Sequence, residues 1–195
     1  MNRVASRSWI VVVLACLLLA GILFYIFDYL LNAGRWVQFP GSPHIFTGDQ
    51  LQKGTVVDRD GVLLLNYGDQ RTYAEQSQIR KATLHWVGDR VGNIQPPLIS
   101  EYTLQMCGYN ALDGVYAYGD HVGSMELTLS AALQTVAMEA IGDRRGVVAV
   151  MNYQTGEILC AVSTPTFDPD NVPDIAGDTS GIYEGVYMNR FTQAT

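Results

Sequence analysis

The sequence predicts an α+β chain with a single membrane-spanning helix near its start, and three stretches carry that prediction. Residues 9–27 form an apolar run without a charge. Residues 53–65 contain two apolar runs around an Asp-Gly turn, which is a strong hairpin signal. Residues 130–163 combine a helical pattern with a second pair of strands. The expected chain is therefore a spanning helix, a small β-rich module, and a helix followed by a β-hairpin.

The apolar run is long enough to cross a bilayer. It has 19 residues, or about 28 Å as a helix, and it exceeds the apolar region of a cleaved signal peptide. We take residues 9–31 as the anchor. Arg3 and Arg7 lie in residues 1–8, which predicts that this tail is cytoplasmic and that the rest of the chain faces outside the cytoplasmic membrane. The aromatic residues suited to the outer interface are Tyr25, Tyr29 and Trp36.

A lipoprotein signal is the alternative interpretation of this stretch. The sequence from Val13 to Cys16 is similar to a bacterial lipoprotein box, after which Cys16 would be lipidated. Only seven apolar residues precede Cys16, and the apolar run continues well past it. These two observations favour the spanning helix.

Charge and cysteine usage exclude several classes of function. The net charge is −7, and it is −9 without the basic tail. No basic stripe interleaved with aromatic residues appears, so we expect no nucleic-acid partner. The cysteines Cys16, Cys107 and Cys160 are too scattered for a disulfide framework or a zinc site. Cys160 is predicted to be a buried thiol in a strand, and a Cys107–Cys160 bridge is left open.

The stretch from residue 127 to residue 170 contains the strongest local pattern. Ser130 is the predicted N-cap of a helix that ends at Gly142. Strands are predicted at 147–151 and 157–163, the first of them covered on both faces. An isolated hairpin is marginal in water, so we expect further strands beside it. The predicted buried face of the helix is made of Leu133, Val136, Ala137, Ala140 and Ile141.

These residues carry a family resemblance. The segments Leu127 to Gln134, Gly146 to Val150, Thr155 to Leu159 and Ser163 to Asp170 resemble the start of the transpeptidase domain of class B penicillin-binding proteins. The resemblance implies the opening of a serine β-lactamase-like fold. Ser130 stands where the family usually has Asp, and Asp170 where it usually has Asn.

The predicted hairpin at residues 53–65 resembles the first block of the same family, Arg-Gly-x-Ile-x-Asp-Arg-x-Gly. Lys53 replaces the family Arg, which keeps the charge but loses bidentate pairing. The resemblance implies a scaffold joining a membrane-proximal module to the catalytic domain. A solvated charge pair, Asp58 with Arg59, is the alternative. The scaffold candidates in this block are Gly54, Asp58, Arg59 and Gly61.

Two shorter blocks follow. The residues from Arg71 to Ala74 resemble the family's Arg-x-Tyr-Pro block without its proline, and those from His85 to Gly88 resemble its His-x-x-Gly block. No nucleophile or metal-ligand partner lies at a recognisable spacing from His85, so we predict a structural histidine. His44 and His121 are predicted to lie in surface loops. Residues 99–118 indicate core or interface packing, with a peptide-binding groove as the alternative.

Three further positions complete the scaffold candidates. Gly156 lies in the predicted hairpin turn, and Asp168 lies in a turn bracketed by prolines, which is preferred to a catalytic pair with Asp170. The pair Asn189 and Arg190 resembles the Asn-Arg pair that precedes the nucleophile motif in the family.

The family carries its acyl-enzyme chemistry on three motifs, Ser-x-x-Lys, Ser-x-Asn and Lys-Thr-Gly. The chain has two lysines, Lys53 and Lys81, and none of the three motifs occurs in it. No catalytic, metal or cofactor-binding residues are assigned. We interpret the sequence as the front portion of such a protein, from a truncated frame or a partial gene model, and predict that it is inactive alone.

The resemblance implies a D,D-transpeptidase that cross-links peptidoglycan stem peptides through an acyl-serine, without a cofactor. Stem peptides and β-lactams would be ligands of the full-length protein, and a multi-spanning glycan-strand polymerase would be its partner. The alternative function is a non-catalytic, membrane-tethered module that binds such a polymerase. The predicted parts are a tail at 1–8, the anchor at 9–31, a linker at 32–52, a pedestal or dimerisation-like module at 53–125 and the start of a transpeptidase domain at 126–195.

Overall fold

The chain divides into two units, residues 1–40 and 41–195, in a computed structural model. The structure describes residues 2–39, 42, 46–47, 50–51, 54–68, 71–110, 112 and 123–193. His44, Lys53 and His121 lie outside the described residues, so the loop predictions for the two histidines stay predictions. The boundaries proposed within 41–195 also stay predictions.

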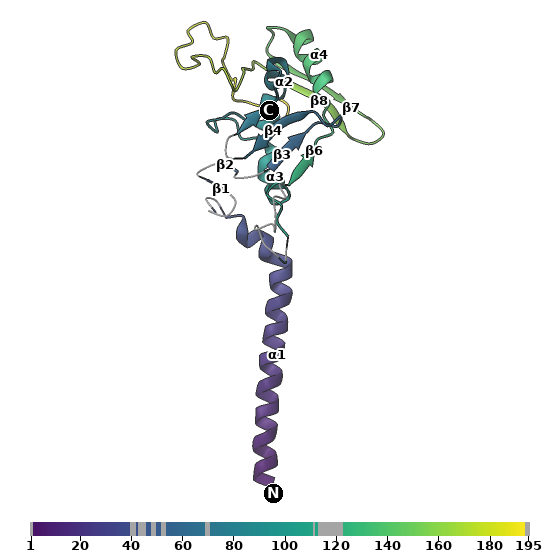
Figure 1. Ribbon diagram of the computed structural model, residues 1–195, viewed down its shortest axis with the longest axis vertical. Helices are drawn as coiled ribbons and strands as arrows, with labels where there is room; N and C mark the ends of the chain where they lie inside the picture. Colours follow the sequence, from purple (N-terminus) through teal and green to yellow (C-terminus); the bar gives the residue numbers. More distant parts are fainter. Residues whose placement is uncertain are drawn as a thin grey trace. The chain divides into compact units, whose positions relative to one another are not determined.

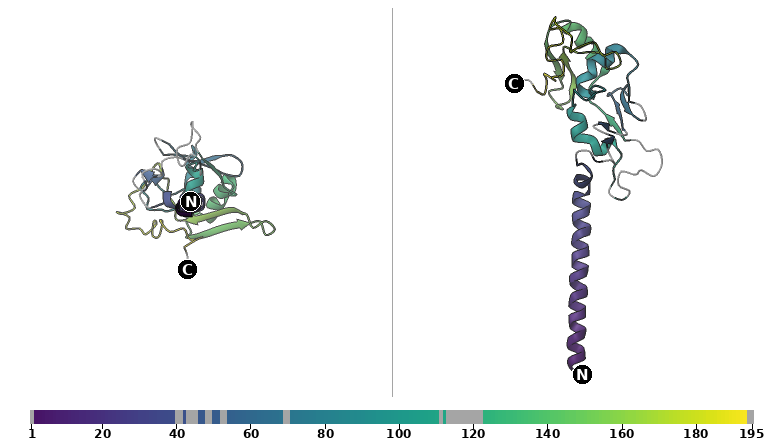
Figure 2. Two further views of the ribbon diagram at one scale, coloured as in Figure 1. Left: turned by 90° about the horizontal axis from the view of Figure 1, so that it is seen from below. Right: turned by 90° about the vertical axis from the view of Figure 1, so that its left-hand side faces the viewer.

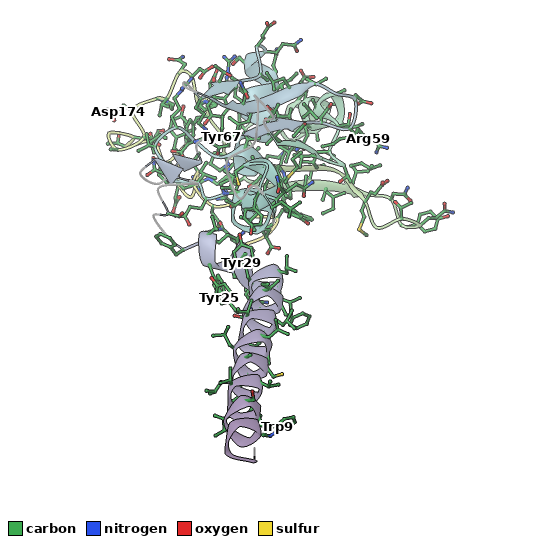
Figure 3. All side chains as sticks on the ribbon, turned by 60° about the horizontal axis from the view of Figure 1, so that its bottom comes forward. Trp9, Tyr25, Tyr29, Arg59, Tyr67 and Asp174 are labelled. Atoms are coloured by element: carbon green, nitrogen blue, oxygen red, sulfur yellow. The ribbon has the colours of Figure 1, made fainter. Side chains whose placement is uncertain are left out.

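The first unit is a single helix, α1, which runs from Asn2 to Val37. Residues 8–37 are long and apolar enough to cross a membrane, with exposed apolar side chains along the helix (Figure 3). The prediction that the chain becomes irregular after Leu31 was wrong. The first proline is Pro40, so nothing interrupts the helical backbone before it. Asn32 also donates a hydrogen bond to Asp28 over 2.7 Å, one helical turn earlier.

Aromatic residues lie at both ends of the apolar run of α1. Trp9 lies near its beginning, and Tyr25 and Tyr29 lie near its far end (Figure 3). The rings of Tyr29 and Trp36 meet edge to face, with 6.2 Å between their centroids. Aromatic residues at both ends of an apolar helix are typical of membrane-spanning segments.

The second unit contains a four-stranded sheet in the order β5-β4-β3-β6 (Figure 1). Strands β3 (Gly54–Val57) and β4 (Leu63–Tyr67) form the antiparallel hairpin predicted around the Asp-Gly turn. Strand β5 (Thr72–Tyr73) is antiparallel to β4, whereas β6 (Ser124–Glu126) is parallel to β3. A separate short pair joins β1 (Phe46–Thr47) to β2 (Gln50–Leu51).

Two helices that the sequence analysis did not predict lie between β5 and β6. Helix α2 (Ser77–Val87) ends at Gly88, and helix α3 (Pro97–Met106) begins at a proline. Leu84 of α2 belongs to a buried cluster with three residues that lie later in the chain. Those residues are Ile94, Phe167 and Val186.

Helix α4 (Ala131–Ile141) confirms the predicted helix, but its buried face differs from the predicted one. Leu133, Val136 and Ala140 are exposed. Gln134 is fully buried instead, because its side-chain oxygen accepts the backbone N–H of Ala161 over 3.0 Å. The face that is buried consists of Ala131, Gln134, Ala137 and Ile141.

Strands β7 (Gly146–Met151) and β8 (Ile158–Thr164) form the second predicted hairpin, a separate two-stranded ribbon (Figure 2). The prediction that β7 is covered on both faces was wrong, since Val150 and Met151 are exposed. Among the described residues, no strand pairs with the outer edge of β7.

The outer edge of β8 is covered by groups from two helices rather than by a strand. Ser130, the residue before α4, donates its backbone N–H to Leu159 over 2.9 Å. Trp86 of α2 donates its indole N–H to the carbonyl of Ala161 over 2.6 Å. These bonds attach the hairpin to both helices and satisfy backbone groups that a strand would otherwise pair.

The Cys107–Cys160 bridge left open by the sequence does not form. Both residues are free and buried, and burial raises the pKa of each thiol. A buried thiol with a raised pKa is a packing residue with little thiolate character.

Candidate functional site

The carboxylate of Asp58 lies at the junction between the β3–β4 hairpin and helix α4. It is 1% exposed. One oxygen accepts the backbone N–H groups of Asp60 and Val62 over 2.9 and 2.8 Å, which closes the hairpin turn. The other accepts the N–H of Ala131 over 2.9 Å, at the first turn of α4. A negative charge there satisfies an unpaired donor and complements the helix dipole.

Ser130 occupies the predicted N-cap position, but its side chain makes no capping bond. Its hydroxyl donates to Asp60 over 3.3 Å instead. Asp58 therefore supplies the carboxylate that a capping residue would normally provide, from a position 73 residues earlier in the chain.

The other residues of this block lie around the same hairpin. Arg59 and Gly61 are exposed in the turn, and Gly61 has a positive φ of 81°. The backbone N–H of Arg59 donates to Leu129 over 3.1 Å, which adds a second link to the approach of α4. Gly54 packs against α3, since a Cβ there would lie 3.1 Å from the Cβ of Met106. Asp58 is thus buried and bonded to backbone amides, and no ion pair with Arg59 appears among the described contacts.

Arg71 closes the C-terminal end of α2. Its guanidinium donates to the carbonyls of Val87, over 2.7 Å, and of Asp89. It lies between the rings of Tyr67 and Tyr73, 4.9 and 5.2 Å from their centroids. Burial raises the pKa of both tyrosines, so their hydroxyls stay protonated, and the Tyr73 hydroxyl donates to the carbonyl of Gly88 over 3.0 Å. A cation at the carbonyl end of a helix is electrostatically favourable.

Replacing Gly88 by alanine is expected to lower the free energy of unfolding by about 2 to 3 kcal/mol. Gly88 has a φ of +76°, and an added Cβ would lie 2.9 Å from the carbonyl oxygen of Ile94. Gly156→Ala is the matched control, because its φ is +78° but its Cβ would meet nothing within 4 Å. It should cost about 1 kcal/mol. Urea unfolding of both variants measures the difference, and equal costs would contradict the expected clash.

Asp168 forms a buried, bidentate ion pair with Arg80 of α2. Arg80 Nε lies 2.7 Å from one carboxylate oxygen and Nη2 lies 2.7 Å from the other, which also accepts the hydroxyl of Ser77 over 2.7 Å. These Arg80 hydrogen bonds hold the pKa of the Asp168 carboxyl well below its usual range. Asp168 also accepts the N–H of Asp170 over 3.0 Å, so the two aspartates belong to one turn.

His85, Asn189 and Arg190 meet where α2 contacts the segment of residues 171–193. His85 is buried, and its Nε2 lies 2.8 Å from the carbonyl oxygen of Val186. Asn189 donates to the carbonyl of His85 over 3.3 Å, and the backbone N–H of Arg190 donates to the hydroxyl of Ser163 over 3.1 Å. The segment is thereby joined to both α2 and β8.

The described contacts of the candidate residues join separate elements of the second unit to one another. None of the serines, histidines or cysteines in the described contacts forms a nucleophile–base pair, and no group of acidic, histidine or cysteine residues within the described parts could hold a metal ion. Gly156, the remaining candidate, lies in the β7–β8 turn, where its N–H donates to Asn152 over 2.8 Å.

The structure brings most of the predicted residues into long-range contacts, but the sequence analysis missed their partners. Arg80 and Ser77 hold Asp168, and Gln134 and Trp86 hold β8. A signal was present for Arg80, since a single arginine on the apolar side of a helix needs a buried partner. Gln134 lies in one of the segments that carry the family resemblance. It is polar and lies outside the apolar pattern of the helix, so the pattern did not predict that it is buried.

Comparison with known proteins identifies a relative of this chain. No family model matches the chain. The peptidoglycan D,D-transpeptidase MrdA of Acinetobacter baumannii is 43% identical over 44 residues. This chain is a partial homologue of the class B penicillin-binding proteins. The match covers 23% of this chain and 6% of MrdA, so it reaches only a small part of that protein.

Two solved structures are also similar to parts of this penicillin-binding protein homologue. Pseudomonas aeruginosa PBP2, crystallised in complex with WCK 5153, gives a TM-score of 0.46 at 21% identity, over 71% of this chain and 34% of that one. The D,D-transpeptidase domain of a peptidoglycan glycosyltransferase from Eggerthella lenta gives 0.49 at 22% identity, over 71% and 31%. The chain thus spans about a third of the length of each solved chain.

Proposed function

We propose that this chain supplies the membrane anchor and the framework on which a peptidoglycan D,D-transpeptidase builds its active site. The 44-residue match to MrdA carries the proposal. The geometry supports it, because Asp58 joins the β3–β4 hairpin to α4 and the Asn189-Arg190 pair is held against α2 and β8. The framework has no chemistry of its own in this proposal.

The proposed setting is the outer side of the cytoplasmic membrane, with α1 as a single-pass anchor. The apolar stretch of α1 and the two arginines before it support this orientation. The substrates would be peptidoglycan stem peptides, cut and rejoined by an acyl-serine in the complete enzyme, which would also bind β-lactams. A multi-spanning glycan-strand polymerase is the proposed membrane partner.

The alternative function, a non-catalytic module tethered to the membrane, is favoured by one observation. Apolar side chains on α4 and β7 remain exposed, among them Leu133, Val136, Val150 and Met151. Exposed apolar surface of this kind is typical of sites that contact another polypeptide. Both functions share the anchor and the framework, and they differ in whether a serine motif is encoded in the same reading frame.

The chain alone is expected not to acquire label from a fluorescent penicillin, because it contains no Ser-x-x-Lys motif. Membranes from cells that express the chain would be labelled, separated by electrophoresis and compared with membranes containing MrdA as the positive control. Stoichiometric labelling that an excess of unlabelled penicillin prevents would contradict the prediction.

Sequencing the genomic DNA beyond the codon for Thr195 separates the two functions. An in-frame continuation into a Ser-x-x-Lys motif supports the framework of a transpeptidase, and the product of the extended frame should then be labelled. A stop codon, together with stable membrane expression of the chain, supports the tethered module instead.

A further inference from the structure

One ionisable side chain lies at the end of the apolar stretch of α1. Asp28 is the only charged residue among residues 9–31, and it follows Trp9 by 19 residues. That spacing is about 28 Å along a helix, so Asp28 lies close to the outer boundary of a hydrocarbon layer about 30 Å thick. Ionisable residues in such segments are rare, and they usually contact another protein group rather than lipid.

The carboxylate of Asp28 is only partly satisfied within its own helix. It accepts one hydrogen bond, over 2.7 Å, from the side-chain amide of Asn32. A carboxylate has room for further donors, and the amide oxygen of Asn32 is also an acceptor. None of the ion pairs formed by the described residues includes Asp28. The two side chains therefore offer more acceptors than donors to a neighbour.

Asp28 and Asn32 lie on one face of α1 together with a glycine. The residues of this face are spaced three or four apart, which aligns them along one side of a helix. Gly21 is the only glycine among residues 9–31, and a Cβ there would meet nothing within 4 Å. A glycine in a membrane-spanning helix lets a second helix approach closely. The Gly21 face consists of Leu14, Leu17, Gly21, Tyr25, Asp28 and Asn32.

The charge on the Gly21 face distinguishes between two possible occupants. Two copies of the chain would insert in the same orientation and bring their Asp28 carboxylates to the same depth, where like charges repel. A different helix with a lysine or arginine at that depth would neutralise the carboxylate. Its N–H groups would also donate to the acceptors of Asp28 and Asn32. The second arrangement is complementary in both charge and hydrogen bonding.

We propose that the Gly21 face binds a membrane-spanning helix of another protein, and that this helix carries a lysine or arginine at the outer end of its span. Gly21 lets the two backbones approach, and Asp28 with Asn32 receives the cation. The inference rests on the membrane anchor of the proposed function, and it adds the chemistry by which that anchor recognises a partner.

A split luciferase in the bacterial inner membrane tests the contact with designed helices. One half is fused to the N-terminus of the full chain, and the other to the N-terminus of a leucine helix, so both insert in the same orientation. The residue at the outer end of the leucine helix is lysine, leucine or glutamate. At equal expression, the lysine helix should associate about five- to tenfold more strongly than the leucine helix, and the glutamate helix no more strongly than leucine.

Substitutions in α1 locate the contact. Asp28→Leu should remove the preference for the lysine helix. Gly21→Leu should weaken the association by about threefold or more, because it keeps the two backbones apart. Ala20→Leu is the matched control, since it adds bulk one residue away and outside the Gly21 face. It should retain the preference.

Three results would overturn the inference. They are equal signals from the lysine and leucine helices, a preference that survives Asp28→Leu, and stronger pairing with a second copy of the chain than with the lysine helix. Alkaline phosphatase fused after Thr195 separates these failures from failure of the proposed anchor, because it is active only outside the cytoplasm. An inactive fusion would overturn the anchor and the contact together, whereas an active fusion confines the failure to the contact.

Discussion

Asp58→Ala is expected to lower the free energy of unfolding of the second unit by about 3 to 5 kcal/mol. The carboxylate is buried and accepts three backbone N–H groups, from Asp60, Val62 and Ala131. Alanine would leave all three donors without their acceptor and would remove the negative charge from the start of α4. Differential scanning fluorimetry of the full chain in micelles should show a melting temperature lower by about 10 °C.

Two variants separate the roles of this carboxylate. Asp58→Asn keeps the size of the side chain and one of its oxygens. The amide oxygen can still close the hairpin turn, but no second oxygen is left to cap α4. The loss in free energy of unfolding should therefore be about half that of Asp58→Ala. Asp60→Ala is the control, because Asp60 is exposed and, among the described contacts, its side chain accepts the long bond from Ser130 alone. It should cost less than about 1 kcal/mol. If Asp58→Ala lowers the free energy of unfolding as little as Asp60→Ala does, Asp58 does not hold the hairpin and α4 together.

Arg80→Met is expected to lower the free energy of unfolding by about 3 to 5 kcal/mol, because it leaves the Asp168 carboxylate buried without its cation. The two side chains are 14% and 7% exposed, and the pair is bidentate. Arg145→Met is the matched control, because it breaks an exposed pair with Glu184, and it should cost less than about 1 kcal/mol. Urea unfolding of the full chain measures both, and similar costs would contradict the importance of the buried pair.

The ion pair between Arg80 and Asp168 also makes the stability of the second unit fall at acid pH. Since Arg80 holds the pKa of Asp168 below that of the unfolded chain, the pair contributes fully above about pH 4 and less as the pH falls further. Asp168→Asn should therefore flatten the loss of stability below pH 4, while lowering stability at pH 7.

Local chemistry made much of the second unit predictable. The Asp-Gly turn fixed the position of the β3–β4 hairpin, and turn residues between two apolar runs fixed the β7–β8 hairpin. Gly142 ended α4 where expected, since it takes the helix C-cap position. Each of these signals concerns residues close together in the sequence, which is why a single sequence was sufficient.

The contacts of the candidate site were less predictable, because the two residues that form each contact are distant in the chain. Arg80 lies 88 residues from Asp168, and His85 lies 101 residues from Val186. The face of α4 was misjudged for the same reason. Periodicity favours Leu133 for the core, whereas Gln134 is buried by a bond to β8 that no local pattern reveals.

The Asp58 carboxylate bonds to residues that are far apart in the chain, and this constrains the order of folding during synthesis. The hairpin turn can close as soon as Val62 leaves the ribosome, but the third donor, at Ala131, is synthesised much later. Until then one carboxylate oxygen stays hydrated, and the bond from the β3–β4 hairpin to the start of α4 is absent. The nascent polypeptide should therefore stay open to proteases and chaperones until α4 emerges, and then close in one cooperative step.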